Sequence, residues 1–297
     1  MILLTGSTGF LGQNLLPHLK EKGYAVRCLI RQNSSTECLK NFCEDKVIGD
    51  ILDESSLKYS MRGIDTVIHL AGIRMEIGNV NFESIFYLGT RHIVDVAKAA
   101  GVKRFIFLST FGARPKAKSR FHHYKWLAEE YLKHSGLKYT VLRPTIIYGP
   151  HDHFVTKWMR KLKNLPIVPI LGRGKNLIQP IGVEDVIQCI LKSLTDPTKE
   201  GITYELAGPD RLSFREIVRQ IGIFIGHKRK LFHWPLSLVK FFAHLSEFLL
   251  PHPPFTRDEL WRWMEDRTSD HHKIEKEFQI KLTPFKEGLK QYFGPKL

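Results

Sequence analysis

Cysteine is scarce in this chain and follows no disulfide or metal-binding pattern. The four cysteines, Cys28, Cys38, Cys43 and Cys189, include no C-x-x-C pair and no zinc-ligand spacing. Cys28 and Cys189 lie in apolar runs and are expected to be small core residues. Unpatterned thiols of this kind are typical of a reducing compartment.

Other metal ligands also lack a convincing arrangement. His151-Asp152-His153 alternates like a metal clip, but it follows Gly149-Pro150 on an expected loop and has no third ligand nearby. His271-His272 lies in a polar stretch, which is typical of a solvated face. We therefore predict no metal site and expect both segments to be solvated.

Long hydrophobic runs are missing as well. No apolar segment reaches the roughly 18 residues that a membrane span requires. A strand pattern that begins at residue 2 leaves no room for a signal peptide before the fold. We therefore expect a cytoplasmic protein, with peripheral attachment to a membrane left open.

Acidic residues are outnumbered by basic ones. The 297 residues include 45 Lys and Arg against 30 Asp and Glu, which gives a net charge of +15. Such a charge attracts dinucleotide phosphates, acidic lipid headgroups, an acidic partner or, without specificity, nucleic acid. The basic residues are scattered rather than aligned in a stripe, and no nucleic-acid motif is present. We therefore predict phosphate-bearing ligands and no specific nucleic-acid partner.

A glycine-rich segment near the N-terminus is the most informative feature that is present. The apolar run Ile2-Leu3-Leu4 leads into Thr5-Gly6-Ser7-Thr8-Gly9-Phe10-Leu11-Gly12, and leucines follow at helical spacing. Glycines at this spacing allow a tight turn, a close approach to a pyrophosphate and tight packing of the helix. The segment predicts a nucleotide whose phosphates bind N–H groups at the start of the helix.

The second expected strand, Tyr24 to Ile30, indicates which dinucleotide is bound. An NAD-binding chain normally places an Asp or Glu at the end of this strand to hold the ribose hydroxyls. This chain has Arg31, Gln32 and Asn33 there. A guanidinium suits a 2′-phosphate, so we predict NADP(H) in preference to NAD(H). The alternative is a solvated Arg at the end of a strand.

Strand and helix patterns alternate through the first two thirds of the chain. Further strands are expected at 47–48, 66–70, 104–109 and 139–144, with helices around 93–97 and 121–134. This alternation predicts the α/β class and a Rossmann-type doubly wound parallel sheet. Ligands of such sheets lie at the carboxyl ends of the strands, which here carry Asp50, Ala71-Gly72, Ser109-Thr110 and Pro144-Thr145.

The regularity falls from about residue 150, where prolines appear, and beyond Gly208-Pro209 the pattern is mostly helical. We expect an NAD(P)-binding Rossmann domain over residues 1–150, completed by about 176–207. Residues 151–175 and 208–297 are expected to form a smaller, mainly helical lobe on the substrate side.

The segment 235–250 is apolar around much of its circumference. Lys240 and His244 interrupt a series of Leu, Val and Phe residues. The pattern predicts a helix that caps the substrate pocket. The alternative is an interfacial helix that rests on anionic lipid or binds a hydrophobic protein partner.

Together these motifs resemble the extended and atypical short-chain dehydrogenase/reductase superfamily over almost the whole chain. The glycine-rich segment is similar to its phosphate loop, Gly49-Asp50-Ile51 to its adenine contact and His69-Leu70-Ala71-Gly72 to the turn beside the cofactor. The stretch from Arg143 to Pro150 is similar to the segment that reaches the nicotinamide. The run from Ser119 to Glu130, with Gln179-Pro180-Ile181, most resembles the branch of the nucleotide-binding accessory subunit of respiratory complex I. Bacterial members of that branch are often described only as NAD(P)-binding or epimerase-like.

The resemblance also implies a set of site residues. The candidate catalytic residues are Thr110 and Lys125, which the resemblance implies, and His122, which shares the helix face of Lys125 by its spacing. The implied cofactor-binding residues are Thr5, Gly6, Ser7, Thr8, Gly9, Phe10, Leu11, Gly12, Arg31, Asp50, Ile51, Leu70, Ala71, Gly72, Ser109, Lys125, Pro144, Thr145 and Ile146.

One departure from the superfamily pattern concerns the proton-transferring phenol. Working members use a Tyr four residues before a Lys, together with a Ser or Thr at the end of the preceding strand. Lys125 matches the Lys, and Thr110 or Ser109 matches the hydroxyl, but Phe121 occupies the Tyr position. A phenyl ring has no proton to donate.

Three accounts follow from this departure. In the first, which we favour, the chain binds NADP(H) as a structural element or redox sensor without doing chemistry. In the second, it is an oxidoreductase or epimerase for a hydrophobic or nucleotide-linked substrate, and His122, on the same helix face as Lys125, replaces the phenol. In the third, a local helix distortion brings Tyr124 into register with Lys125. From another class of function, an accessory or assembly protein of a membrane complex would dock through the 235–250 helix.

Overall fold

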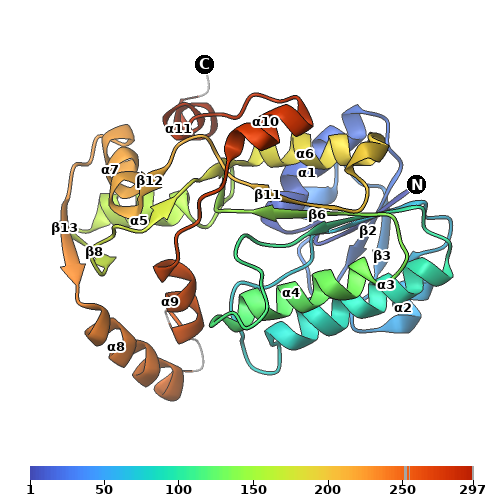
Figure 1. Cartoon of the computed structure of the whole chain (residues 1–297), viewed down its shortest axis with the longest axis horizontal. Helices are drawn as coiled ribbons and strands as arrows, with labels where there is room; N and C mark the ends of the chain where they lie inside the picture. The colour runs from blue at the N-terminus through green and yellow to red at the C-terminus, as the bar shows by residue number, and fades with distance from the viewer. Residues whose placement is uncertain (251–252, 254, 296–297) are drawn as a thin grey trace. The chain divides into compact units, whose positions relative to one another are not determined.

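A seven-stranded sheet forms the centre of the nucleotide-binding part of the chain in the computed structural model, which describes residues 1–250, 253 and 255–295. The strand order is β11-β6-β5-β4-β1-β2-β3, and every pairing from β6 to β3 is parallel (Figure 1). The predicted Rossmann-type α/β class is confirmed. The strands are β1 (Ile2–Thr5), β2 (Val26–Ile30), β3 (Asp45–Ile48), β4 (Thr66–His69), β5 (Arg104–Leu108), β6 (Tyr139–Pro144) and β11 (Ile202–Leu206).

Helices cover both faces of this sheet, because parallel neighbours require crossover connections. Figure 1 shows α2, α3 and α4 on one face and α1 and α6 on the other. The apolar positions of α1 and α3 are buried, as their spacing predicts. The bounds are α1 (Phe10–Glu21), α2 (Glu54–Ser60), α3 (Gly89–Ala99), α4 (Arg120–Lys133) and α6 (Val183–Thr195), with short 3₁₀ turns η1 (Glu37–Leu39) and η3 (Pro197–Lys199) and a π-helical turn η2 (Glu83–Leu88).

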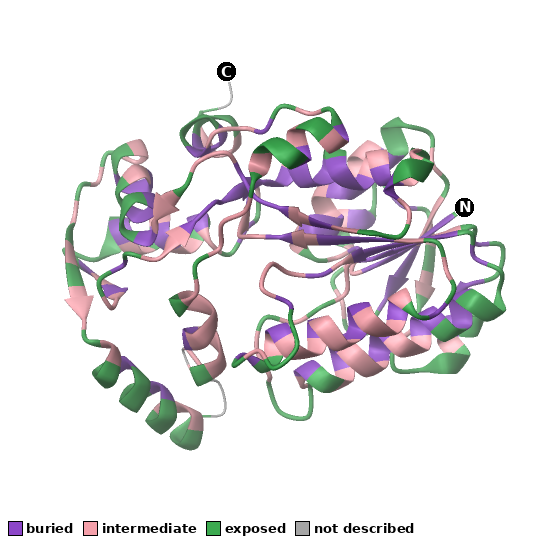
Figure 2. Cartoon of the chain, in the orientation of Figure 1, coloured by how far each residue is buried: buried purple, intermediate pink, exposed green. Residues whose placement is uncertain are grey.

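The chain divides into two compact units. Unit 1 comprises Met1–Arg143 and Ile187–Tyr204, and unit 2 comprises Pro144–Val186 and Glu205–Leu297. Unit 2 has its own core around Tyr148, Trp158 and Phe285. Figure 2 colours buried residues along its helices and strands. Its elements are β7 (Ile147–Tyr148), α5 (Val155–Asn164), β8 (Ile167–Leu171), β9 (Leu177–Ile178), β10 (Ile181–Gly182), β12 (Leu212–Ser213), α7 (Phe214–Phe224), β13 (Lys230–Trp234), α8 (Leu236–Leu249), α9 (Arg257–Met264), α10 (His271–Phe278) and α11 (Phe285–Phe293).

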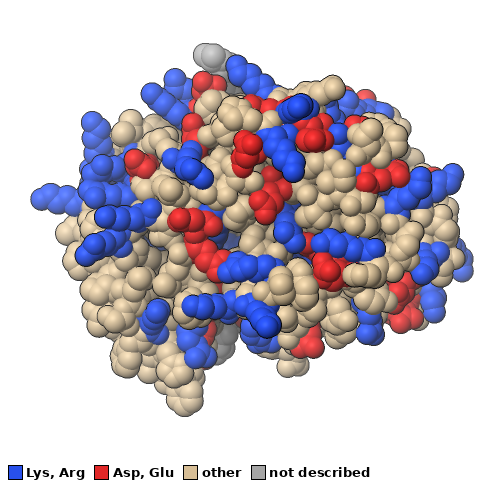
Figure 3. Space-filling model, in the orientation of Figure 1, with Lys and Arg blue, Asp and Glu red and all other residues tan. Residues whose placement is uncertain are grey.

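The surface and the thiols agree with the composition. Lys and Arg are scattered among Asp and Glu on the face shown in Figure 3. Cys28 and Cys189 are fully buried, as expected of small core residues, and all four cysteines are free thiols. None of the helices in the described ranges is long and apolar enough to cross a membrane.

Candidate functional site

The loop between β1 and α1 forms an anion-binding turn. Gly6 has a φ of +72°, and a Cβ on it would lie 2.8 Å from the backbone N of Ala71. A Cβ on Gly12 would lie 2.4 Å from the carbonyl O of Gly6, so only glycine lets α1 start this close to the loop. In the described part of the chain no side chain caps α1, and its first turn holds no acidic residue. Its first N–H groups are therefore available to an anion.

This turn opens into a pocket of unit 1 with a cavity volume of about 150 Å³. Ten of the implied cofactor residues line it: Thr5, Gly6, Thr8, Gly9, Arg31, Asp50, Ile51, Leu70, Ala71 and Gly72. Gly49, from the segment likened to the adenine contact, lines it as well. Five further lining residues were missed by the sequence reasoning: Leu29, Ile30, Ser34, Ile73 and Ile85. Leu29 and Ile30 adjoin residues that the motifs singled out, whereas Ile85 comes from the π-helical turn and had no sequence signal.

A buried polar chain behind the pocket orients Thr5. The Thr5 hydroxyl lies 2.7 Å from Nδ1 of His69, and Nε2 of His69 lies 3.1 Å from the Thr90 hydroxyl. The backbone N–H of Ala71 donates to the same Thr5 hydroxyl. Burial, with a smaller contribution from the positive charge of Lys125, lowers the pKa of His69 to about 3, so its imidazole is neutral.

Arg31 and Asp50 both line the pocket, but they differ in their hydrogen-bond partners. The Arg31 side chain is exposed, and among the described residues no carboxylate pairs with it. The Asp50 carboxylate accepts the backbone N–H of Leu52 at 2.9 Å, which fixes the turn after β3. Together with the uncapped start of α1 and the glycine cradle, these residues fit the pyrophosphate and ribose of a dinucleotide.

Lys125 of α4 is buried against the end of β5. Its Nζ donates to the carbonyl O of Leu108 at 2.8 Å and lies 4.6 Å and 4.7 Å from the ring centroids of Phe86 and Phe107. Burial lowers the pKa of Lys125 to about 7, although the Glu129 carboxylate acts in the opposite direction. The amino group is therefore poised between its two protonation states near neutral pH.

Phe121 lies one turn before Lys125 in a hydrocarbon environment. Its ring meets the rings of Phe82 and Phe86 edge-on, with centroid separations of 5.4 Å and 4.9 Å. Phe82 and Phe86 stack on each other at the start of the π-helical turn. These contacts are apolar packing of the kind that a phenyl ring stabilises.

The two candidate hydroxyls after β5 have different partners. Ser109 donates to the Glu129 carboxylate, which also accepts the Arg143 guanidinium at 2.5 Å and is fully buried. Ser109 is therefore part of a buried charge network. Thr110 is half-buried, and the bond that its hydroxyl makes within the described residues is a long one of 3.3 Å to the carbonyl O of Phe111. Of the two hydroxyls, that of Thr110 makes the weaker hydrogen bond to the protein, so it is the more available to a ligand.

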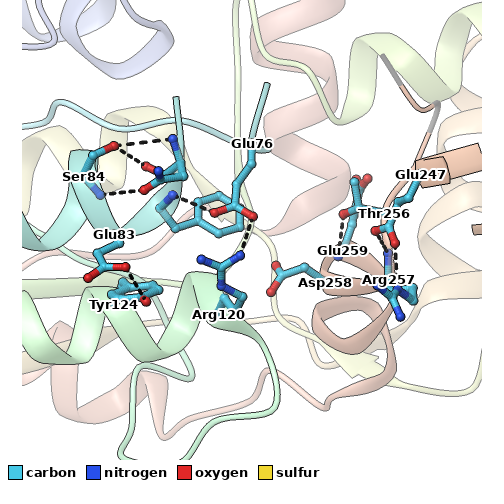
Figure 4. Close-up of polar contacts among 12 residues, drawn as sticks. Glu76, Glu83, Ser84, Arg120, Tyr124, Glu247, Thr256, Arg257, Asp258 and Glu259 are labelled. Atoms are coloured by element: carbon cyan, nitrogen blue, oxygen red, sulfur yellow. Dashed lines mark hydrogen bonds and ion pairs between the residues drawn. The ribbon is translucent and has the colours of Figure 1, made fainter. Parts of the chain in front are cut away.

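His122 and Tyr124 point in different directions from α4. His122 is buried, and a Cβ on Gly112, in the loop that follows Thr110, would lie 3.0 Å from its ring. The Tyr124 hydroxyl instead donates to the Glu83 carboxylate at 2.9 Å (Figure 4). α4 is a continuous α-helix from Arg120 to Lys133. The helix distortion proposed to bring Tyr124 into register with Lys125 is therefore absent from α4, and that expectation was wrong.

Of the other implied cofactor residues, Ser7 is buried in the loop before α1, Leu11 is buried in α1 and Phe10 is the first residue of that helix. Pro144, Thr145 and Ile146 belong to unit 2. The Thr145 N–H donates to the carbonyl O of Leu206 at 2.9 Å, and its hydroxyl donates to the carbonyl O of Gln179. These bonds fix the backbone of the segment after β6.

The histidine-rich segments are only partly as expected. His151 and His153 are exposed, but Asp152 is buried and its carboxylate accepts the N–H groups of Gly149 and Thr156. At the start of α10, ligand atoms of His271, His272 and Glu275 lie within 4.8 Å of one another. This cluster is partly solvated, and Nδ1 of His272 lies 3.3 Å from a carboxylate oxygen of Glu275.

The chain belongs to the NAD-dependent epimerase/dehydratase family, whose model matches residues 2–207. Membership implies the binding of a dinucleotide of the NAD(P) type. Among solved structures, a UDP-glucose 4-epimerase from Thermotoga maritima is similar over 98% of this chain and 96% of its own, with a TM-score of 0.75 and 21% identity. MoeE5 in complex with UDP-glucose and NAD is similar over the same shares, with a TM-score of 0.77 and 19% identity. At these identities the likeness shows the fold.

Curated relatives place the chain near an accessory subunit of respiratory complex I. The mitochondrial NADH dehydrogenase [ubiquinone] 1 alpha subcomplex subunit 9 of Arabidopsis thaliana is 29% identical over 84% of this chain and 64% of its own length. The corresponding Mus musculus subunit is 29% identical over 73% of this chain, which spans 59% of that protein. A ceramide reductase of Caulobacter vibrioides is 26% identical over 79% of this chain and 74% of its own length.

Proposed function

We propose that the chain binds NADP(H) and keeps it as a structural element or redox sensor, without the phenol-based proton transfer of working superfamily members. The observation that carries this proposal is Phe121, four residues before Lys125 and packed edge-on against Phe82 and Phe86. A bound nicotinamide supplies or accepts a hydride, but a carbonyl reduction also needs a proton donor beside it.

The environment of Lys125 supports the same proposal. The Lys that holds the nicotinamide ribose in related enzymes must present its amino group to the ribose. Here the Lys125 amino group donates to Leu108 and lies between two aromatic rings. These partners hold the amino group in place whether or not hydride transfer takes place.

Arg31 supports NADP(H) as the cofactor. Its guanidinium is exposed at the pocket, and in the described residues no acid competes for it. The planar fork of N–H donors in a guanidinium fits the oxygens of a 2′-phosphate better than it fits a ribose 2′-hydroxyl.

The second candidate function is an active oxidoreductase or epimerase. It is favoured by the position of His122, whose ring packs on Gly112, close in sequence to Thr110. His122 would donate the proton in place of the phenol, and a relative named ceramide reductase shows that a reductase exists at this distance in sequence. The substrate would be hydrophobic or nucleotide-linked and would contact the lobe formed by residues 151–175 and 208–297.

An accessory or assembly role is the remaining candidate. The relatives include subunits of mitochondrial NADH dehydrogenase and a photosystem II assembly factor of Trieres chinensis. Such a role is compatible with an idle cofactor, because a ligand that binds only the folded state stabilises it by mass action.

A single-turnover experiment distinguishes the idle cofactor from the active enzyme. NADPH-loaded protein is mixed with an aliphatic aldehyde, and the absorbance of the reduced nicotinamide is followed. We expect no detectable decay in the native chain and measurable decay in Phe121→Tyr. The rate constant of Phe121→Tyr should exceed the detection limit set by the native chain by at least about 100-fold, the usual contribution of a positioned general acid.

Two variants complete this experiment. Tyr124→Phe removes a phenol that points to Glu83 and should leave the rates unchanged. Decay in the native chain that is abolished by His122→Gln or Lys125→Ala would contradict the idle-cofactor proposal and establish the second candidate.

A further inference from the structure

The face of α8 that points away from unit 2 is apolar and exposed. Val239 and Ala243 are fully buried and pack with Leu260 of α9. The exposed fractions of Phe241, Phe248 and Leu249 are 62%, 83% and 62%. Figure 2 shows exposed residues along most of α8.

These exposed side chains form one stripe rather than isolated positions. At 100° per residue, Leu238, Phe241, Phe242, Leu245, Phe248 and Leu249 fall within an arc of about 120°. The buried residues lie on a different side of the helix, and Lys240, His244 and Glu247 lie between the two faces. A stripe of this size next to a polar face is typical of a helix that lies in an interface.

α8 has basic neighbours in the stretches that contain α5, β8 and β13 and a neighbour of mixed charge in α9, where Asp258 and Glu259 stand beside Arg257 and Arg262. Residues 155–176 contain six Lys or Arg and no Asp or Glu, and residues 228–250 contain four Lys or Arg and one Glu. The two stretches lie side by side, because β13 pairs with β8 along its whole length. The single acid, Glu247, accepts the Arg257 guanidinium at 2.6 Å and is neutralised (Figure 4). In Figure 3 the area over α8 shows few charged side chains, with Lys and Arg and some Asp or Glu at its border.

A pocket opens where α8 begins. Its cavity volume is about 620 Å³, within the range of small-molecule sites. Trp234 and Leu236 line one side of it and Leu260 and Trp263 of α9 the other. Arg173 and Lys175, in the loop between β8 and β9, are exposed at its wall, and no carboxylate in the described ranges pairs with either. The pocket therefore combines apolar walls with two cations.

We propose that α8 and this pocket together form a binding site for anionic phospholipid. The stripe of α8 enters the boundary between headgroups and acyl chains, the Arg173 and Lys175 side chains bind the phosphate of one lipid, and an acyl chain of that lipid lies against Trp234 and Trp263. Charge complementarity favours this occupant over a hydrophobic protein segment, because the exposed cations Arg173 and Lys175 lie at the pocket wall and Lys240 lies on α8 beside the stripe. The site lies wholly in unit 2 and does not depend on the dinucleotide.

Flotation of the full chain with vesicles tests the surface. We expect binding to vesicles of phosphatidylcholine mixed with phosphatidylglycerol, little binding to phosphatidylcholine alone, and weakening by salt. Phe241→Asp with Phe248→Asp should reduce binding at least about tenfold, since two apolar anchors become anionic. Ile48→Asp and Ile223→Asp introduce the same charge at residues that are 65% and 60% exposed elsewhere, and should leave binding unchanged.

Short-chain lipids below their micelle concentration test the pocket. Dihexanoyl phosphatidylglycerol should change the tryptophan fluorescence in a saturable way, whereas glycerol 3-phosphate and dihexanoyl phosphatidylcholine should bind at least about tenfold more weakly. Arg173→Gln with Lys175→Gln should weaken the phosphatidylglycerol response, and Lys22→Gln with Lys98→Gln, both exposed in unit 1, should not. Circular dichroism and an unaltered thermal unfolding transition check that each variant is folded.

Three results would overturn the proposal. The first is equal binding to neutral and anionic vesicles. The second is binding of glycerol 3-phosphate as tight as that of the lipid, which would identify a free-phosphate site. The third is no vesicle binding by the native chain, which would leave the stripe to a protein partner. Self-association that Phe241→Asp abolishes would accompany this result if that partner is a second copy of the chain.

Discussion

The buried amino group of Lys125 makes the stability of unit 1 depend on pH. Its pKa is lowered from 10.5 to about 7 in the folded chain. Between pH 7 and 10.5 the Lys125 amino group is therefore protonated in the unfolded chain and neutral in the folded one. The cost of burying the charge is absent above pH 10.5, grows as the pH falls and is complete below pH 7. Lys125→Met should therefore raise the free energy of unfolding at pH 6 by at least about 1.4 kcal/mol, the worth of one pKa unit.

Chemical denaturation at several pH values measures this effect. The difference between Lys125→Met and the native chain should shrink as the pH rises from 7 toward 10. Lys98→Met, the same change at an exposed position of α3, provides the control and should shift neither the stability nor its pH profile. A destabilising Lys125→Met at pH 6 would show that the bond to Leu108 outweighs the cost of burial.

Arg31 determines which dinucleotide we expect to bind more tightly. Arg31→Ala should weaken NADPH about 10- to 100-fold, since hydrogen bonds to charged groups contribute about 1.5–3 kcal/mol each. NADH binding should change little, because it carries no 2′-phosphate. Arg31→Lys keeps the positive charge but loses the fork of donors, so its affinity for NADPH should lie between those of the native chain and Arg31→Ala. Calorimetric titration with both nucleotides measures these affinities, and equal losses for NADPH and NADH would reject the assignment.

The helix α1 depends on the absence of a side chain at its third residue. A Cβ on Gly12 would lie 2.4 Å from the Gly6 carbonyl O and 2.6 Å from the Ser7 Cα, and backbone atoms cannot rotate away. Gly12→Ala should therefore destabilise unit 1 by about 1–3 kcal/mol, the usual cost of overpacking. Gly12→Ala should also weaken the binding of NADPH, because the loop before α1 must shift to make room for the Cβ.

Thermal unfolding and NADPH titration of this variant check both expectations. Glu21→Ala, on the exposed last turn of α1, is the matched control and should change neither. An unaltered NADPH affinity in Gly12→Ala would show that the start of α1 does not hold the phosphates.

The elements that the sequence predicted well are those defined by local patterns. The buried leucines of α1 and the strand-helix alternation depend on neighbouring residues, so they could be predicted without knowledge of the fold. Errors arose at the ends of elements. Tyr24 was assigned to β2, but its N–H donates to the carbonyl O of Leu19, so it belongs to the turn that closes α1.

The features that the sequence could not predict depend on contacts between distant segments. The π-helical turn before α3 has no sequence pattern, yet it supplies Phe86 to Lys125 and Ile85 to the pocket. Glu129 belongs to a quoted motif, but its partners meet it only in the folded chain: Ser109 directly follows β5 and Arg143 belongs to β6. The site was therefore predictable at its glycines and not in its buried electrostatics.

For the molecule as a whole, the central claim is that a dinucleotide binds at the start of α1 in unit 1. Such a ligand stabilises the folded state in proportion to the logarithm of its concentration. The wide basic excess, 45 Lys and Arg against 30 Asp and Glu, would assist capture of any polyanion without deciding which one binds. Specific binding must therefore be separated from general attraction.

Calorimetric titration of the native chain with NADPH at physiological ionic strength separates the two most directly. The account predicts saturable one-to-one binding that is tighter than that of NADH and survives added salt. No heat and no thermal stabilisation with either nucleotide, oxidised or reduced, would contradict it.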